Sequence, residues 1–124
     1  MIRNKTVGIL SKKTSYDIWI GEHLLKQKTK DLGLTLTHKK IAIITDKNVH
    51  ASQYSNLLNQ VADLDIKPHL FLIEPGESSK SWDILIKVLD WLNELNFDRT
   101  DYIIAFGGGV VGDLVSLAAS LFRR

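Results

Sequence analysis

Short apolar runs alternate with longer helix-like stretches from residue 40 onward, and this order constrains the fold more than any other feature. The apolar runs cover residues 40–45, 69–73 and 101–106. Each is only five or six residues long and rich in isoleucine, leucine or phenylalanine, which is typical of strands buried on both faces. Strands of this kind occur in parallel sheets that are covered by helices. The three runs therefore predict three neighbouring parallel strands.

Three helices are predicted between and after these strands. Residues 49–61 and 82–95 carry apolar side chains at helical spacing, and residues 110–122 read as an apolar helix. Ser81 is well placed to cap the second helix, because its hydroxyl can accept a hydrogen bond from a free N–H of the first turn. The resulting β-α-β-α-β-α order predicts an α/β domain with a Rossmann-like parallel sheet and helices on both faces.

The first forty residues are predicted to add two strands and one helix. Residues 6–10 and 16–20 read as an N-terminal strand pair beside the sheet, joined by a polar turn. Residues 22–32 predict a short helix, and Gly33 is a plausible stop. The 124 residues are enough for one domain, which we place at 1–124.

The composition argues against several classes of protein. No apolar run approaches the roughly 20 residues that span a bilayer, and cysteine is absent. The net charge is only +2 and the lysines are scattered, whereas nucleic-acid-binding proteins concentrate basic residues in a stripe. The four histidines lack the spacing of metal ligands. We therefore expect a cytoplasmic protein with no membrane or nucleic-acid partner and no metal site in this chain.

The glycine-rich segment 107–113 is the strongest local signal for function. It follows a predicted strand directly and opens a helix. Glycines let the backbone approach a ligand closely, and the free N–H groups of the helix N-terminus favour an anion such as a pyrophosphate. The alternative is a glycine turn that serves only tight packing. The segment is not a Walker loop, because no Gly-Lys-Ser/Thr follows it.

Two further polar loops are predicted at the same edge of the sheet. Asp46 and Asn48 follow the first of the three strands, where an acidic side chain can bind ribose hydroxyls or simply cap a helix. Glu77 and Lys80 follow the second strand, where they could read a nucleotide or lie on a solvated turn. The convergence of three polar strand-end loops favours the binding interpretation for all of them.

The motifs together resemble the 3-dehydroquinate synthase family of sugar-phosphate cyclases, and the resemblance covers nearly the whole chain. The glycine segment is also close to that of polyol dehydrogenases of the glycerol dehydrogenase type, and other sugar-phosphate cyclases share the same domain. A stand-alone nucleotide-binding module is a third alternative. The motifs that carry the resemblance are residues 15–21, 45–49, 75–80 and 107–113, followed by Ala118, Ala119 and Arg124.

The resemblance implies a role for individual residues. Those that would contact the adenosine part of NAD are Asp46, Asn48, Glu77 and Lys80. Those that would hold the pyrophosphate and the neighbouring ribose are Gly108, Gly109, Val110 and Asp113. Arg124 would bind the phosphate of the substrate, because a planar guanidinium can pair with two phosphate oxygens at once.

The resemblance also implies the chemistry of a larger protein. The family converts 3-deoxy-D-arabino-heptulosonate 7-phosphate, a sugar-acid phosphate, to 3-dehydroquinate with NAD as cofactor, in the shikimate pathway of aromatic amino acid biosynthesis. Zinc or another divalent metal is bound by a C-terminal domain that this chain does not contain. We therefore expect no catalytic residue and no activity in residues 1–124 alone, and a homodimer for the full-length protein.

Overall fold

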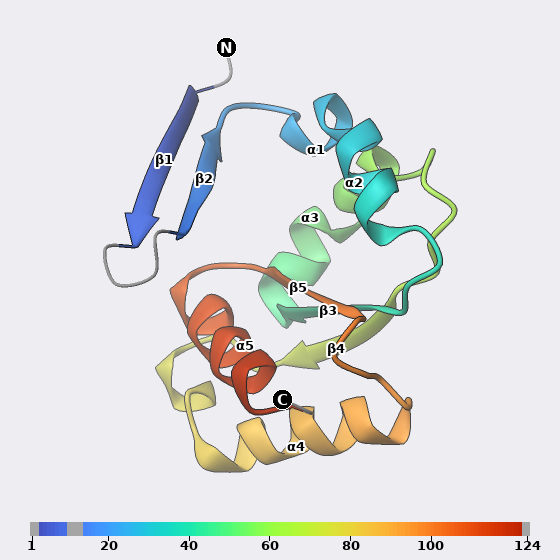
Figure 1. The fold of residues 1–124 in the computed structure, drawn as a ribbon. Helices are drawn as coiled ribbons and strands as arrows, with labels where there is room; N and C mark the ends of the chain where they lie inside the picture. Colours follow the sequence, from blue (N-terminus) through green and yellow to red (C-terminus); the bar gives the residue numbers. More distant parts are fainter. Residues whose placement is uncertain (1–2, 10–13, 123–124) are drawn as a thin grey trace.

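The computed structural model describes residues 3–9 and 14–122, and its elements alternate from β3 onward as the sequence predicts (Figure 1). The strands are β1 (Arg3–Ile9), β2 (Thr14–Ile20), β3 (Ile41–Asp46), β4 (His69–Ile73) and β5 (Tyr102–Phe106). The helices are α1 (Leu24–Gln27), α2 (Thr29–Leu36), α3 (Lys47–Gln60), the 3-10 helix η1 (Glu77–Ser79), α4 (Trp82–Glu94) and α5 (Gly109–Leu121).

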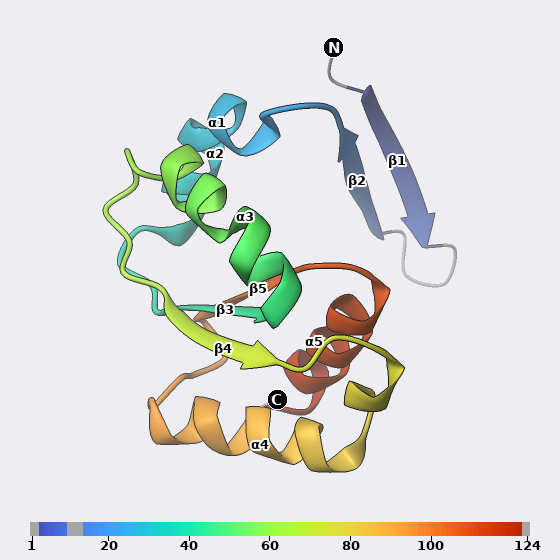
Figure 2. The same cartoon turned by 180° about the vertical axis from the view of Figure 1, so that it is seen from behind.

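The three strands from residue 41 onward form one parallel sheet with the order β4-β3-β5. Thr45 of β3 lies opposite Phe106 of β5, and Asp46 lies opposite Ile73 of β4, so the three carboxyl ends reach the same edge. In Figures 1 and 2, α3 lies on one face of the sheet while α4 and α5 lie on the other. The predicted fold class, a parallel sheet with helices on both faces, is confirmed.

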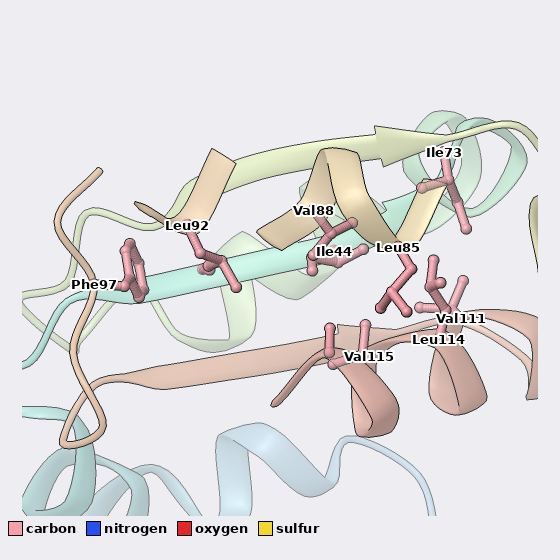
Figure 3. Packing of buried hydrophobic residues seen from close by; sticks show 11 residues of the cluster. Ile44, Ile73, Leu85, Val88, Leu92, Phe97, Val111, Leu114 and Val115 are labelled. Carbon is pink, nitrogen blue, oxygen red and sulfur yellow. The ribbon is translucent and has the colours of Figure 1, made fainter. Parts of the chain in front are cut away.

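The main hydrophobic core lies between the sheet and the α4–α5 layer (Figure 3). Successive side chains of β3 point to opposite faces, and Ala42 and Ile44 are the ones that join this core. Ile41 and Ile43 are equally buried but alternate with them, so they face the α3 side. The other members of the core are Ile73, Leu85, Val88, Leu92, Phe97, Val111, Leu114, Val115 and Ala118.

The N-terminal strand pair is also confirmed, as an antiparallel hairpin of β1 and β2. The hairpin forms a sheet of its own and is not hydrogen-bonded to β3, β4 or β5. Its contact with the next element includes Lys28, whose ammonium lies 3.5 Å from the centre of the Trp19 ring. Leu10, the predicted end of the first strand, lies outside the described residues.

The helix predicted for residues 22–32 is wrong in its bounds and in its stop. The structure has two short helices that meet at Lys28, and Gly33 lies inside the second of them. Thr29 donates its hydroxyl to the carbonyl of Lys26 at 2.7 Å, a local bond that competes with a continuous helix. The second helix continues past Gly33 because this buries Leu36, which is 5% exposed.

The backbone at the end of α4 brings Phe97, which follows the helix, into the core. Asn96 adopts the left-handed conformation, and the N–H of Phe97 donates to the carbonyl of Leu92 at 3.0 Å. This Schellman pattern folds Phe97 back onto Leu92 in the core. The ammonium of Lys40 also donates to the carbonyls of Leu95 and Asn96, at 3.0 and 2.8 Å.

Within the ranges described, no helix combines the length and apolarity needed to cross a membrane.

Candidate nucleotide-binding edge

The helices that follow β3 and β5 leave these adjacent strands toward opposite faces of the sheet (Figure 2). The backbone segments that leave the two strands therefore diverge at their carboxyl ends. In open parallel sheets this is the position at which ligands bind. The predicted glycine segment follows β5, and Asp46 is the last residue of β3.

The first turn of α5 has backbone donors that no side chain of a capping residue satisfies. The Asp46 carboxylate caps α3 by accepting from the N–H of Val49 at 2.8 Å, and the Ser81 hydroxyl accepts from the N–H of Ile84 at 3.3 Å at the start of α4. The corresponding residue of α5 is Gly108, which has no side chain to play this part. The N–H groups and the positive end of the helix dipole thus lie at the carboxyl-end edge of the sheet.

The three glycines before α5 differ in what surrounds them. A Cβ at Gly107 would lie 2.8 Å from Val111 Cγ2, so this glycine is needed for close packing of strand and helix. A Cβ at Gly108 or Gly109 would meet no atom within 4 Å. Gly108 has a φ of −82°, which any residue adopts, so its lack of a side chain leaves open space rather than relieving backbone strain. The open space at Gly108 and Gly109, which a side chain would occupy, is the glycine cradle.

Three of the predicted site residues form one ionic cluster. The Lys80 ammonium lies 2.8 Å from Asp113 Oδ2 and 3.5 Å from Glu77 Oε2. The hydrogen bond to Asp113 raises the pKa of Lys80 above its ordinary value of 10.5, and the charge of Glu77 adds to this effect. The loop after β4 is thereby held against the first turn of α5. Lys80 stands beside the glycine cradle as a fully charged cation.

The structure places Asp46 and Asn48 at the same sheet edge but outside this cluster. Asp46 is half-buried and serves as the cap of α3, which is the alternative that its position also predicted. The helix begins at Lys47 rather than at the predicted residue 49, because this cap starts it earlier. Asn48 is exposed in the first turn of α3. Its carbonyl accepts from the Ser52 hydroxyl at 2.9 Å.

Two contacts that sequence reasoning missed tie the loops together. The ammonium of Lys47 pairs with the carboxylate of Glu74, which joins the first residue of α3 to the first residue after β4. Ser79 is only 3% exposed, and its hydroxyl donates to the carbonyl of Glu74 at 2.5 Å. Lys47 and Ser79 lie within the motifs 45–49 and 75–80, but their shared partner Glu74 is recognised only once the strands are aligned.

A pocket of about 250 Å³ adjoins the Lys80–Asp113 pair between the first turns of α4 and α5. Its lining is mostly apolar, and the sequence motifs did not single it out. Trp82 stands at its rim with 73% of its surface exposed. The lining residues are Lys80, Ser81, Trp82, Leu85, Asp113, Leu114 and Leu117.

Two further expectations concern a metal and the substrate. Among the residues described, no three histidine or acidic side chains are grouped in a way that would hold a metal ion. Arg124, the predicted ligand of the substrate phosphate, lies outside the described residues.

Comparison with solved structures identifies the class of this fold. A 2-deoxy-scyllo-inosose synthase complexed with carbaglucose-6-phosphate, NAD+ and Co2+ superposes with a TM-score of 0.81 at 20% identity, over 98% of this chain and 32% of that one. The 2-epi-5-epi-valiolone synthase ValA from Streptomyces hygroscopicus subsp. jinggangensis 5008, with NAD+ and Zn2+ bound, gives 0.75 at 33% identity, over 95% of this chain and 32% of that one. The fold is that of the sugar-phosphate cyclases.

Sequence comparison narrows the class to one family. Residues 70–124 match the family described as 3-dehydroquinate synthase N-terminal. The 3-dehydroquinate synthase of Caulobacter vibrioides is 39% identical over all of this chain and 33% of its own length, and that of Ruegeria pomeroyi is 35% identical over 97% and 32%. The chain spans about a third of the length of these relatives. The chain is therefore similar to the N-terminal part of 3-dehydroquinate synthases.

Proposed function

We propose that residues 1–124 form the NAD-binding domain of a 3-dehydroquinate synthase. The observation that carries this proposal is the open cradle at Gly108 and Gly109, directly in front of the uncapped first turn of α5. A phosphate fits such a place because backbone N–H groups and the helix dipole both favour negative charge. The two solved relatives are complexes with NAD+, which supports the same assignment.

Each predicted site residue has a definite task in this proposal. The N–H groups that follow Gly108 and Gly109 hold the pyrophosphate, with Val110 in the same turn. Lys80 supplies a positive charge beside them, and Asp113 and Glu77 orient its ammonium. Asp46 and Asn48 bind the adenosine part from the neighbouring strand end. Bound NAD supplies a reversible hydride transfer, and this domain contributes the position of the cofactor.

The reaction of the whole protein is the second part of the proposal. It converts 3-deoxy-D-arabino-heptulosonate 7-phosphate to 3-dehydroquinate and phosphate, as a step of aromatic amino acid biosynthesis in the cytoplasm. The support is the identity of 39% and 35% to 3-dehydroquinate synthases. In this proposal Arg124 binds the substrate phosphate. The divalent metal and the catalytic groups belong to a further domain, and the full-length protein is a homodimer.

The proposal is tested with the full-length protein that carries this chain. Isothermal titration with NAD is expected to show saturable binding, and the loaded protein is expected to release inorganic phosphate from the heptulosonate phosphate. Residues 1–124 alone are expected to release none. Release of phosphate by residues 1–124 alone, at the roughly 1–1000 per second typical of enzymes, would contradict the assignment of the catalytic groups to another domain.

A further inference from the structure

The loop after β4 carries Glu77 and Lys80. Most of this loop is exposed, yet one of its side chains is buried and hydrogen-bonded. Ser79 is buried within it at 3% exposure, although the residues on either side of Ser79 are exposed. Burying a hydroxyl in this way is unfavourable unless it finds a partner. Its partner is the carbonyl of Glu74, at 2.5 Å. The 3-10 turn is therefore folded back onto Glu74, the first residue after β4.

Glu74 is held in turn by its side chain. Its carboxylate pairs with Lys47, the residue between Asp46 and Asn48, so the start of α3 is joined to the loop after β4. At the other end of the loop, Lys80 reaches Asp113 of α5. These contacts thus link the segments that follow all three strands. Glu74 is its central member because it contributes both a charged group and a carbonyl.

We propose that Glu74 is a positioning residue for the nucleotide site, acting with Lys47 and Ser79. This inference rests on the proposed function. Glu74 fixes the spacing between the β3–α3 junction, which bears Asp46 and Asn48, and the loop that bears Glu77 and Lys80. A dinucleotide that contacts both segments binds best when this spacing is set in advance, since ordering a loop on binding costs affinity. Neither Glu74 nor Lys47 needs to touch the ligand.

The test is a charge exchange in the full-length protein, with NAD affinity measured by titration calorimetry. Lys47→Glu and Glu74→Lys are each expected to weaken NAD binding by about threefold to fivefold, the scale of an exposed ion pair. The double variant is expected to recover most of the affinity, because it restores the pair with reversed charges. Thermal unfolding midpoints are expected to stay close to that of the wild type.

A second pair of variants tests the other contact of Glu74. Ser79→Ala is expected to weaken NAD binding, while Ser78→Ala, an exposed neighbour in the same turn, is the matched control and is expected to bind normally. Single variants that bind NAD as tightly as the wild type, or a double variant no better than the single ones, would overturn the positioning role. A wild-type protein that does not bind NAD would instead overturn the proposed function, and this inference with it.

Discussion

The Lys80 ammonium and the Asp113 carboxylate lie 2.8 Å apart, and they connect the loop after β4 to the first turn of α5. Both residues were predicted to contact the cofactor, one from each of two loops. Their pairing shows that the loop after β4 contacts α5 directly. The pair also fixes the charge state of Lys80, since the hydrogen bond to Asp113 raises the pKa of the ammonium.

This raised pKa predicts how the pair responds to alkaline conditions. A lysine whose folded pKa lies above its unfolded value stabilises the fold fully below the unfolded value, here 10.5, and loses that contribution as the pH rises through the folded pKa. The difference in unfolding midpoint between the wild type and Lys80→Met is therefore expected to be small and constant up to that value, and to shrink above it. A difference that already vanishes near neutral pH would contradict the pairing.

Gly107 and its neighbours are predicted to respond differently to the same substitution. Gly107→Ala places a Cβ 2.8 Å from Val111 Cγ2, and Val111 is only 1% exposed and has no room to move. A loss of about 1–3 kcal/mol in the free energy of unfolding is expected, as for other overpacked cores. Gly109→Ala has open space and is expected to cost much less. Urea titrations of both variants make the comparison, and equal losses would contradict the structure.

Thr45 is a buried residue whose side chain works against the fold. It is completely buried, and its hydroxyl has no hydrogen-bond partner among the residues described. Thr45→Val keeps the shape of the side chain and removes the unpaired hydroxyl. The free energy of unfolding is therefore expected to rise by about 1 kcal/mol. Differential scanning calorimetry measures the change. If Thr45→Val instead lowers the free energy of unfolding by a similar amount, the hydroxyl has a partner in solution, such as an internal water.

Asn96 is predicted to be important for the end of α4. Its φ of 56° lies in the left-handed region, which alanine tolerates poorly and glycine accepts. Asn96→Ala is expected to lower the free energy of unfolding by about 1 kcal/mol, and Asn96→Gly is expected to be as stable as the wild type or slightly better. If both variants unfold at the same denaturant concentration, the helix does not end in the conformation described.

The fold was largely predictable because its signals are local. The apolar runs of β3, β4 and β5 reflect burial on both faces, and the cap at Ser81 depends on residues within one turn. Gly33 shows the limit of such reasoning. It looks like a helix stop, but a Cβ there would lie 3.1 Å from Leu64 Cδ2, so its role is set by a distant contact. Nothing near Gly33 in the sequence announces that contact.

The candidate site divides in the same way. The glycine segment and the acidic strand ends were found from residue types at strand ends, since parallel strands bring these ends together. The partners of Lys80 and Glu74 were not predicted, because many lysines and carboxylates in this chain are equally plausible partners until the register is known. Residues 82–95 were predicted to carry apolar side chains at helical spacing, and Trp82 fits this spacing, yet it is 73% exposed whereas Val88 is fully buried. The rotation of the helix decides this, and spacing alone does not.

The most direct test of the central claim is the affinity of Gly108→Val for NAD in the full-length protein. The backbone conformation at Gly108 suits any residue and its Cβ position is open, so the variant is expected to fold with an unchanged circular dichroism spectrum and a similar unfolding midpoint. The valine methyl groups would occupy the space assigned to the pyrophosphate, so titration calorimetry is expected to detect no NAD binding. A well-folded Gly108→Val protein that binds NAD as tightly as the wild type would contradict the account, because the glycine segment would then be only a packing turn.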